Sequence, residues 1–179
     1  MADSIIKFLE DHIDLVDDGK FELLYGELPI EISWAYLTQL LYDCEIDPLQ
    51  SFSYVPTYFA TQCILPSNFK LPENISSIGS HAFLRTNLTK IDIPARCETI
   101  GSTAFGGCSD LSIVNISSGL REIERYAFYG CTNLQTINYE GSLEQWYDIQ
   151  KANHWLASNP IRAKQITIRC LDGIVQREI

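Results

Sequence analysis

The feature that most constrains this chain is a repeat of about 23 residues that begins near residue 54. A phenylalanine marks each unit and recurs at intervals of 24, 22 and 23 residues, at Phe59, Phe83, Phe105 and Phe128. Other apolar columns keep the same phase, among them Ile78, Ile100 and Ile123; Leu88, Leu111 and Leu134; and Ile91, Val114 and Ile137. A single unit cannot bury its own apolar edge, so a period of this length predicts stacked coils that share one core.

Each unit carries a short strand of the form Leu-x-x-Ile-x-Ile, as in residues 88–93 and 111–116. Side chains alternate along a strand, so the apolar positions point inward and the intervening residues point outward. A turn follows each strand, and a return segment then carries Ile-Gly-x-x-Ala-Phe. The pattern predicts parallel strands, an internal column of phenylalanine rings, and a second internal column that contains Cys108 and Cys131.

The segments that carry this pattern are LPENISSIGSHAFLRTNLTKIDIP, ARCETIGSTAFGGCSDLSIVNI and SGLREIERYAFYGCTNLQTINY. They resemble the BspA-type leucine-rich repeat family over residues 54–141, and the tail to about residue 173 resembles the closing unit of that family. Two positions depart from the family pattern, because Thr86 replaces the usual cysteine and Glu124 replaces the usual glycine. The resemblance implies a short solenoid of about four coils. It also implies a relation to surface adhesins, since the family is often found on bacterial and protozoal cell surfaces.

The two ends of the solenoid need covers, because an open edge of stacked strands invites aggregation. Apolar spacing and cap residues predict three short helices near the start, over residues 3–18, 20–25 and 31–44. The tail predicts a helix over residues 142–151 and a strand over residues 165–170. We therefore expect an α+β protein with three parts: an acidic helical N-terminal domain (1–50), leucine-rich repeats (51–141) and a C-terminal helix-strand cap (142–179).

The net charge of −10 is confined to the first quarter of the chain. Residues 1–50 hold twelve acidic and two basic residues, whereas the remainder is balanced. An acidic surface repels nucleic-acid phosphate and attracts a basic protein, so we expect a protein partner of basic character and no direct nucleic-acid binding. The candidate contact residues here are Asp11, Asp14, Asp17 and Asp18. The alternative is a solvated helical surface that keeps the protein soluble.

The sequence contains no recognisable catalytic, metal or cofactor motif. It has no GxSxG, P-loop or GxGxxG segment, its six cysteines form no CxxC pair, and its three histidines are far apart. We therefore predict a non-enzymatic protein without metal or cofactor. An alternative is an enzyme whose site lies between the helical cap and the first coils, lined by Tyr36, Tyr42, Tyr54 and Tyr58.

Outward strand positions predict a binding surface, because solenoids bind through continuous faces. One column comprises Asn68, Lys90, Ile113 and Thr136, and a second comprises Lys70, Asp92, Asn115 and Asn138, with Glu140 at the edge. Ile113 is apolar among polar neighbours and is a candidate contact anchor. The alternative is a solvated sheet face without a partner. A rival surface on the return segments contains Tyr126 and Tyr129.

These observations favour an intracellular, non-enzymatic protein-protein interaction module. The chain has no apolar run of 18 residues and no basic-then-apolar leader, so we expect no membrane association and a cytoplasmic location in a bacterial or phage-infected host cell. A sharper hypothesis is an acidic inhibitor, of phage or mobile-element type, that binds a basic, nucleic-acid-acting host protein. The alternative from another class is a fragment or relative of a bacterial surface adhesin.

Overall fold

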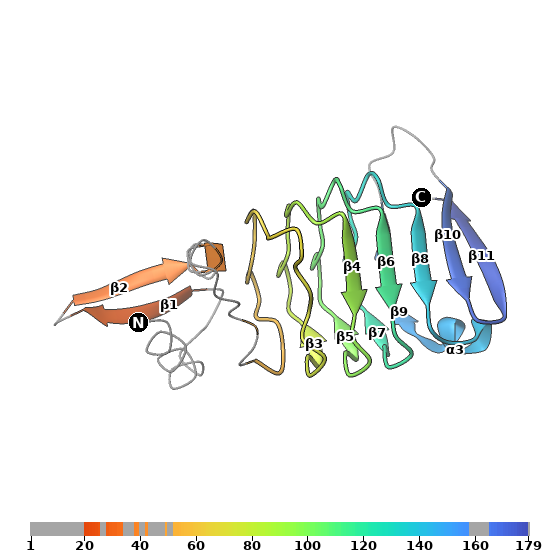
Figure 1. The fold of residues 1–179 in the computed structure, drawn as a ribbon, viewed down its shortest axis with the longest axis horizontal. Coiled ribbons are helices and arrows are strands. Elements are labelled where there is room, and N and C mark those ends of the chain that lie inside the picture. Colours follow the sequence, from red (N-terminus) through yellow and green to blue (C-terminus); the bar gives the residue numbers. More distant parts are fainter. Residues whose placement is uncertain are drawn as a thin grey trace.

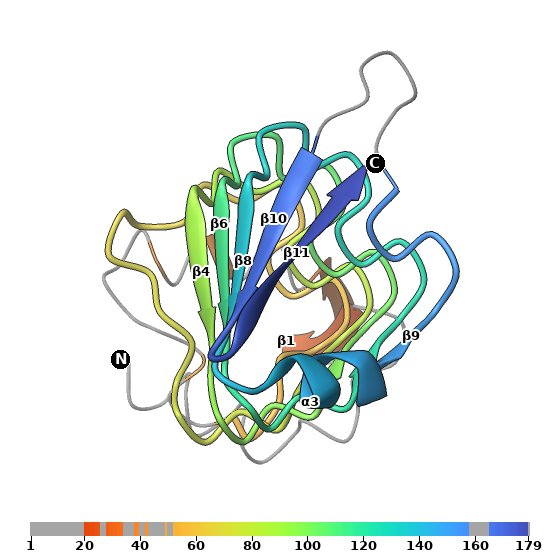
Figure 2. The ribbon, with the colours of Figure 1, turned by 90° about the vertical axis from the view of Figure 1, so that its right-hand side faces the viewer.

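In the computed structural model, the chain from residue 52 to residue 157 winds into a stack of coils (Figure 1). The structure describes residues 20–25, 28–33, 38–39, 42, 49, 52–157 and 165–178. Seen along the stack, the coils superpose and carry their strands on separate sides (Figure 2). This is the solenoid with parallel strands that the repeat predicts.

The larger sheet runs along one side of the stack and has the strand order β11-β10-β8-β6-β4. Its strands are β4 (Lys90–Ile93), β6 (Ile113–Ile116), β8 (Thr136–Tyr139), β10 (Gln165–Cys170) and β11 (Gly173–Glu178). All neighbours are parallel except β11, which pairs antiparallel with β10. Ile91 pairs with Val114, and Val114 with Ile137, so the sheet register follows the sequence repeat.

A second sheet of two-residue strands lies on another side, in the order β3-β5-β7-β9. Its members are β3 (Ser77–Ile78), β5 (Thr99–Ile100), β7 (Glu122–Ile123) and β9 (Gln150–Lys151). The return segments bond to one another as well: the Phe83 and Phe105 amides donate to the carbonyls of Ala104 and Ala127, each at 2.8 Å. Adjacent coils are therefore held by backbone hydrogen bonds on three sides.

The predicted column of phenylalanine rings fills the core. Phe83 and Phe105 stack with centroids 5.3 Å apart, and Phe105 and Phe128 stack at 5.2 Å, with both pairs nearly parallel. Phe59 meets Phe83 edge-on at one end, and Trp155 meets Phe128 edge-on at the other. All five side chains are buried. Ring stacking thus runs continuously through the coils and ends on an aromatic cap.

The second internal column contains Thr86, Cys108 and Cys131. The Cys108 thiol donates to the Phe83 carbonyl at 3.0 Å, and the Cys131 thiol donates to the Phe105 carbonyl at 3.1 Å. Thr86 donates to the Phe83 carbonyl within its own coil at 3.1 Å and lies 3.3 Å from the Cys108 sulfur. The threonine hydroxyl and the cysteine thiols thus each donate a hydrogen bond to the carbonyl of a phenylalanine in the ring column. This shared bond explains why threonine is accepted where the repeat usually has cysteine.

The C-terminal end is closed by a short helix and a β-hairpin. Helix α3 (Leu143–Asp148) begins with a capping box between Ser142 and Gln145 and buries Trp146. Strand β10 then pairs with β8, as the tail predicts, and β11 adds a further strand that the sequence analysis does not predict. Together these elements cover the edge of the last regular coil.

The N-terminal cap differs from the prediction. Strands β1 (Lys20–Tyr25) and β2 (Leu28–Ser33) form an antiparallel pair, so the helix expected over residues 20–25 is wrong, as is the start of the helix expected over residues 31–44. In the segment 28–33, isoleucine and leucine alternate with Pro29, Glu31 and Ser33. Alternation of this kind fits a strand, and a proline removes a helical hydrogen bond.

Only part of the remaining helical prediction can be compared with the structure. Thr38, Gln39 and Tyr42 are helical, whereas the helix expected over residues 3–18 lies outside the described residues. A cap of three helices is therefore not supported. The expected count of about four coils is not supported either, because one corner with positive φ recurs in five successive coils, at Tyr58, His81, Thr103, Tyr126 and His154.

Candidate binding surface

The outer face of the larger sheet displays the residues that the strand pattern predicts. In β4 and β6 the burial alternates, so Lys90, Asp92 and Ile113 are exposed and Asn115 is partly exposed, while their apolar neighbours are buried. The register places Lys90 beside Ile113 and Ile113 beside Thr136. The same register aligns Asp92 with Asn115 and Asn115 with Asn138. Two straight columns of outward side chains result.

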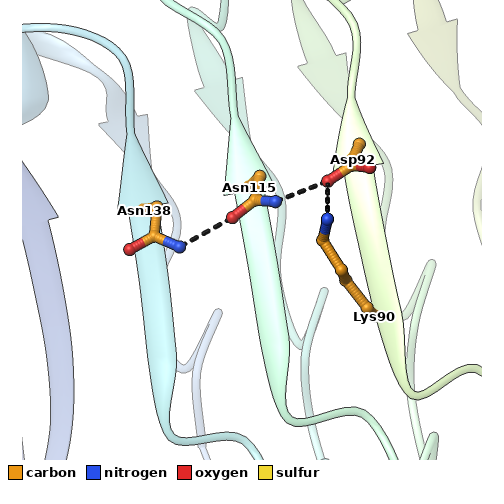
Figure 3. A network of polar contacts seen from close by, with 4 residues as sticks. All are labelled: Lys90, Asp92, Asn115 and Asn138. Atoms are coloured by element: carbon orange, nitrogen blue, oxygen red, sulfur yellow. Dashed lines mark hydrogen bonds and ion pairs between the residues drawn. The ribbon is translucent and has the colours of Figure 1, made fainter.

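The second column forms a hydrogen-bonded ladder across three strands (Figure 3). The Asn138 side-chain amide donates to Asn115 Oδ1 at 2.7 Å, and the Asn115 amide donates to Asp92 Oδ1 at 2.5 Å. Lys90 Nζ lies 3.1 Å from the same Asp92 oxygen. Each bond fixes a rotamer, so the row has a defined direction with its carboxylate end on β4. We refer to Asp92, Asn115 and Asn138 as the polar ladder.

A shallow depression of about 350 Å³ lies where the three strands end. Its walls include five of the predicted contact residues: Lys70, Asp92, Asn115, Asn138 and Glu140. Lys90, Ile113 and Thr136 are placed on the same sheet beside it. Glu73 and Ser117 also line the depression. The predicted contact set covers only outward strand positions and therefore misses both, since Ser117 directly follows β6 and Glu73 lies in a turn before β3. The signal that could have found them is the repeat itself, which places turns at residues 72, 94 and 117.

Ile113 stands out on this face. Within β4, β6 and β8 it is the one large apolar side chain that is exposed, with 37% of its surface accessible. It is the middle member of its column, between Lys90 and Thr136. An apolar side chain surrounded by ordered polar groups has the arrangement of an interface centre with a polar rim.

The other candidate sites are not brought together in the same way. Asp11, Asp14, Asp17 and Asp18 lie outside the described residues, as does Tyr36. Tyr42 packs edge-on against Phe69, and Tyr58 stacks on His81 at 4.8 Å, so these tyrosines make packing contacts. Across the described part of the chain, no three His, Cys, Asp or Glu side chains converge on a point where a metal ion would fit.

A second hollow lies elsewhere, between α3 and the turns that precede the small strands. It has a volume of about 590 Å³ and is lined by Glu98, Arg121, Glu122 and Asp148 among others. Arg121 and Glu98 form an exposed ion pair with a nitrogen–oxygen distance of 3.5 Å. Its lining includes the hydroxyl-bearing residues Thr99, Ser118 and Tyr139 but no histidine, so it holds no hydroxyl–histidine pair for nucleophilic catalysis.

Comparison with known proteins now identifies the repeat. Residues 41–152 match the model of the BspA type leucine rich repeat region, in six copies. This chain belongs to the BspA-type leucine-rich repeat family. The match confirms the resemblance and extends its beginning from residue 54 to residue 41. BspA-type repeats belong to a class of families that are generally non-enzymatic binding modules, and the family indicates a protein-interaction module.

One solved structure that is similar is a leucine rich cell surface protein from Faecalibacterium prausnitzii A2-165. The two chains are 29% identical, with a TM-score of 0.45, over 56% of this chain and 33% of that chain. The present chain thus matches about a third of that protein's length. No curated protein matches this chain. Within the residues that the structure describes, no helix has the length and apolar character needed to cross a bilayer.

The expectation of a cytoplasmic location is wrong. Membership of the BspA-type family overturns it, because this family points to a surface or extracellular location. The expectation rested on the missing leader and the missing apolar run. Neither feature of the sequence reports where the protein acts.

Proposed function

We propose that this chain is the binding module of a surface or extracellular BspA-type protein and that it holds a protein partner on the outer face of β4, β6 and β8. The observation that carries this proposal is the polar ladder beside the exposed Ile113 on a sheet whose strands are in register. The proposal takes up the adhesin alternative rather than the intracellular one.

The geometry of the face suits protein recognition. The ladder holds its amide groups in one rotamer each, so less side-chain entropy is lost when a partner binds. Ile113 supplies an apolar centre, and Lys90, Asp92 and Thr136 supply a polar rim. The depression at the strand ends, with Lys70 and Glu140 in its wall, adds shape to an otherwise flat sheet.

Neither the family nor the solved neighbour supports an acidic phage inhibitor. A role of Asp11, Asp14, Asp17 and Asp18 in attracting a basic partner stays a prediction, because these residues lie outside the described part of the chain. The division into parts at residues 50 and 141 also stays a prediction. The proposed face does not depend on either of them.

The test compares matched variants of the immobilised chain in affinity capture of extracellular proteins from the source environment, quantified by mass spectrometry. Ile113→Asp places a charge at the centre of the face, and we expect it to reduce capture of the partner by about tenfold or more. The control is Ile64→Asp, where the side chain is 72% exposed and lies outside the strands of the larger sheet. Circular dichroism verifies that both variants are folded. Equal capture by the Ile113→Asp and Ile64→Asp variants would contradict the proposal.

A further inference from the structure

The coil corners adopt a backbone conformation that ordinarily favours glycine. Five of them have φ between 56° and 63°, at Tyr58, His81, Thr103, Tyr126 and His154. A side chain in this left-handed region costs about 1 kcal/mol relative to glycine. A second corner, four residues further along, holds Gln62 and Arg85 in the earlier coils and Gly107 and Gly130 in the later ones. The first corner therefore keeps a side chain in all five coils, whereas the second corner avoids this conformational cost only at Gly107 and Gly130.

These corner residues form a ridge along the stack, with one ring pair on each side of Thr103. Tyr58 and His81 stack at 4.8 Å with an angle of 17°, and Tyr126 and His154 lie 5.8 Å apart with an angle of 39°. Tyr129 meets the Tyr126 ring edge-on at 5.6 Å and is 44% exposed. Non-glycine residues held in a strained backbone conformation cluster at functional sites, so these corners are candidates for a binding role.

One end of the ridge is cationic. The Arg125 guanidinium carbon lies 4.7 Å from the centroid of the Tyr126 ring, and Arg125 Nη2 donates to the Tyr126 hydroxyl oxygen at 2.9 Å. Because that oxygen accepts a hydrogen bond, its own hydrogen is left to donate outward. The guanidinium and the hydroxyl thus present several donors side by side, which is the arrangement that a carboxylate recognises.

A second arginine, Arg85, lies over Gly107, in the coil next to the one that carries Tyr126 and Tyr129. Gly107 has no side chain, and the position that its Cβ would take lies 2.9 Å from Arg85 Cγ and 3.8 Å from Arg85 Nε. The Gly107 amide donates to the Tyr129 carbonyl at 2.6 Å, so the Arg85 side chain crosses the coil that adjoins Tyr129. The bare glycine backbone makes room for this crossing.

The charges of the two arginines are not compensated within the described residues. Neither Arg85 nor Arg125 takes part in an ion pair there. Glu124, the neighbour of Arg125 in sequence, accepts the Ser102 amide at 2.7 Å and is thereby held against the backbone. A local positive surface on a chain whose net charge is −10 attracts an acidic group selectively.

We propose that Arg85, Arg125, Tyr126 and Tyr129 form a second docking surface, which binds an acidic segment of a protein partner. Arginine and tyrosine are the residues that dominate protein interfaces. Arg125, Tyr129 and His154 pack around the Tyr126 ring, so the surface offers hydroxyl and guanidinium donors more than open ring faces. Donors of this kind suit the carboxylates of a peptide better than the apolar face of a sugar. The surface belongs to the return segments and is independent of the outer sheet face.

The test measures binding of a fluorescein-labelled deca-glutamate peptide to the full chain by fluorescence anisotropy. We expect binding that weakens with salt and that falls about tenfold or more in the Arg85→Gln/Arg125→Gln variant. The control variant, Arg96→Gln/Arg169→Gln, removes the same total charge at exposed positions elsewhere, and its affinity should stay within about twofold. Tyr126→Phe removes only the hydroxyl and should weaken binding by about threefold or more.

Three results would overturn the proposal. The first is no binding of deca-glutamate, and the second is an equal loss of affinity in the two double variants, which would indicate attraction by total charge alone. The third is tighter binding of an oligoglucuronate of equal charge, which would assign the surface to an acidic glycan. If circular dichroism shows that the Arg85→Gln/Arg125→Gln variant is misfolded, the Tyr126→Phe variant decides, and unchanged affinity in that variant would then count against the proposal.

Discussion

At the residue scale, the cysteines show how burial in the core of a repeat suppresses the reactivity of a thiol. Cys108 and Cys131 are buried in the core and donate to carbonyls of the preceding coil. Loss of hydration raises the pKa of both thiols and raises the pKa of Cys97 to about 12. A thiol that does not ionise is a poor nucleophile and a poor metal ligand. These cysteines stabilise the core as packing and hydrogen-bonding residues.

The raised pKa values predict a loss of stability in alkali. A buried thiol such as Cys97 stays protonated in the folded chain to about pH 12, whereas in the unfolded chain it ionises near its ordinary value of 9.0. The stabilising effect is therefore complete below pH 9 and is lost as the pH rises from 9 toward 12. Urea denaturation at a series of pH values measures the decline, which Cys97→Ala should make shallower. A free energy of unfolding that stays constant up to about pH 10.5 would contradict this reasoning.

At the scale of the element, each coil is stabilised mainly by what its neighbours place against it. Phe105 shows this most directly, because Phe83 covers one ring face and Phe128 covers the other. The inward positions of the strands behave in the same way, since Val114 lies between Ile91 and Ile137. A coil in the middle of the stack depends on both neighbours.

Phe105→Ala should therefore be among the most damaging single changes. Removal of a fully buried phenylalanine leaves a cavity and costs about 3–5 kcal/mol of unfolding free energy. The matched control is Ile113→Ala on the outer face, which should cost less than about 1 kcal/mol because the side chain is partly exposed. Chemical denaturation compares the two variants. Similar losses at both positions would show that the ring column is not the core of the stack.

The elements that could be predicted from the sequence are those that repeat. The inward columns and the outward positions of Asp92, Asn115 and Asn138 follow from the phase of the repeat alone. The N-terminal hairpin could not be predicted in this way, because residues 20–33 occur once and a short apolar run fits a helix or a strand equally well. The direction of the polar ladder and the path of Arg85 over Gly107 depend on rotamers, which the pattern does not specify.

At the scale of the whole molecule, the two ends decide whether the stack stays a single particle. Strand β10 pairs with β8, and β11 then covers β10 with an antiparallel strand. Asp172, in the turn between these strands, accepts the Leu143 amide at 2.7 Å and ties the hairpin to α3. Without this hairpin, β8 would present its open backbone edge and the buried Ile137 to solvent.

Deletion of residues 165–179 should therefore cause aggregation rather than a simple loss of stability. The exposed edge of β8 is a template for pairing with another chain. Light scattering and size-exclusion chromatography measure the effect, with Leu171→Ser as the control, because this side chain is 80% exposed in the hairpin turn and does not hold the pairing. A truncated chain that stays monomeric would show that the hairpin is not needed as a cap.

The three-sided hydrogen bonding between coils also determines how the protein responds to mechanical load. When the two ends are pulled apart along the stack, the coil interfaces lie in series, so the weakest one separates first and the others remain closed. Each detached coil of about 23 residues releases roughly 75–80 Å of slack chain. A molecule built in this way lengthens in steps under tension. Each step is the separation of one pair of coils, and it dissipates energy before the chain is fully extended.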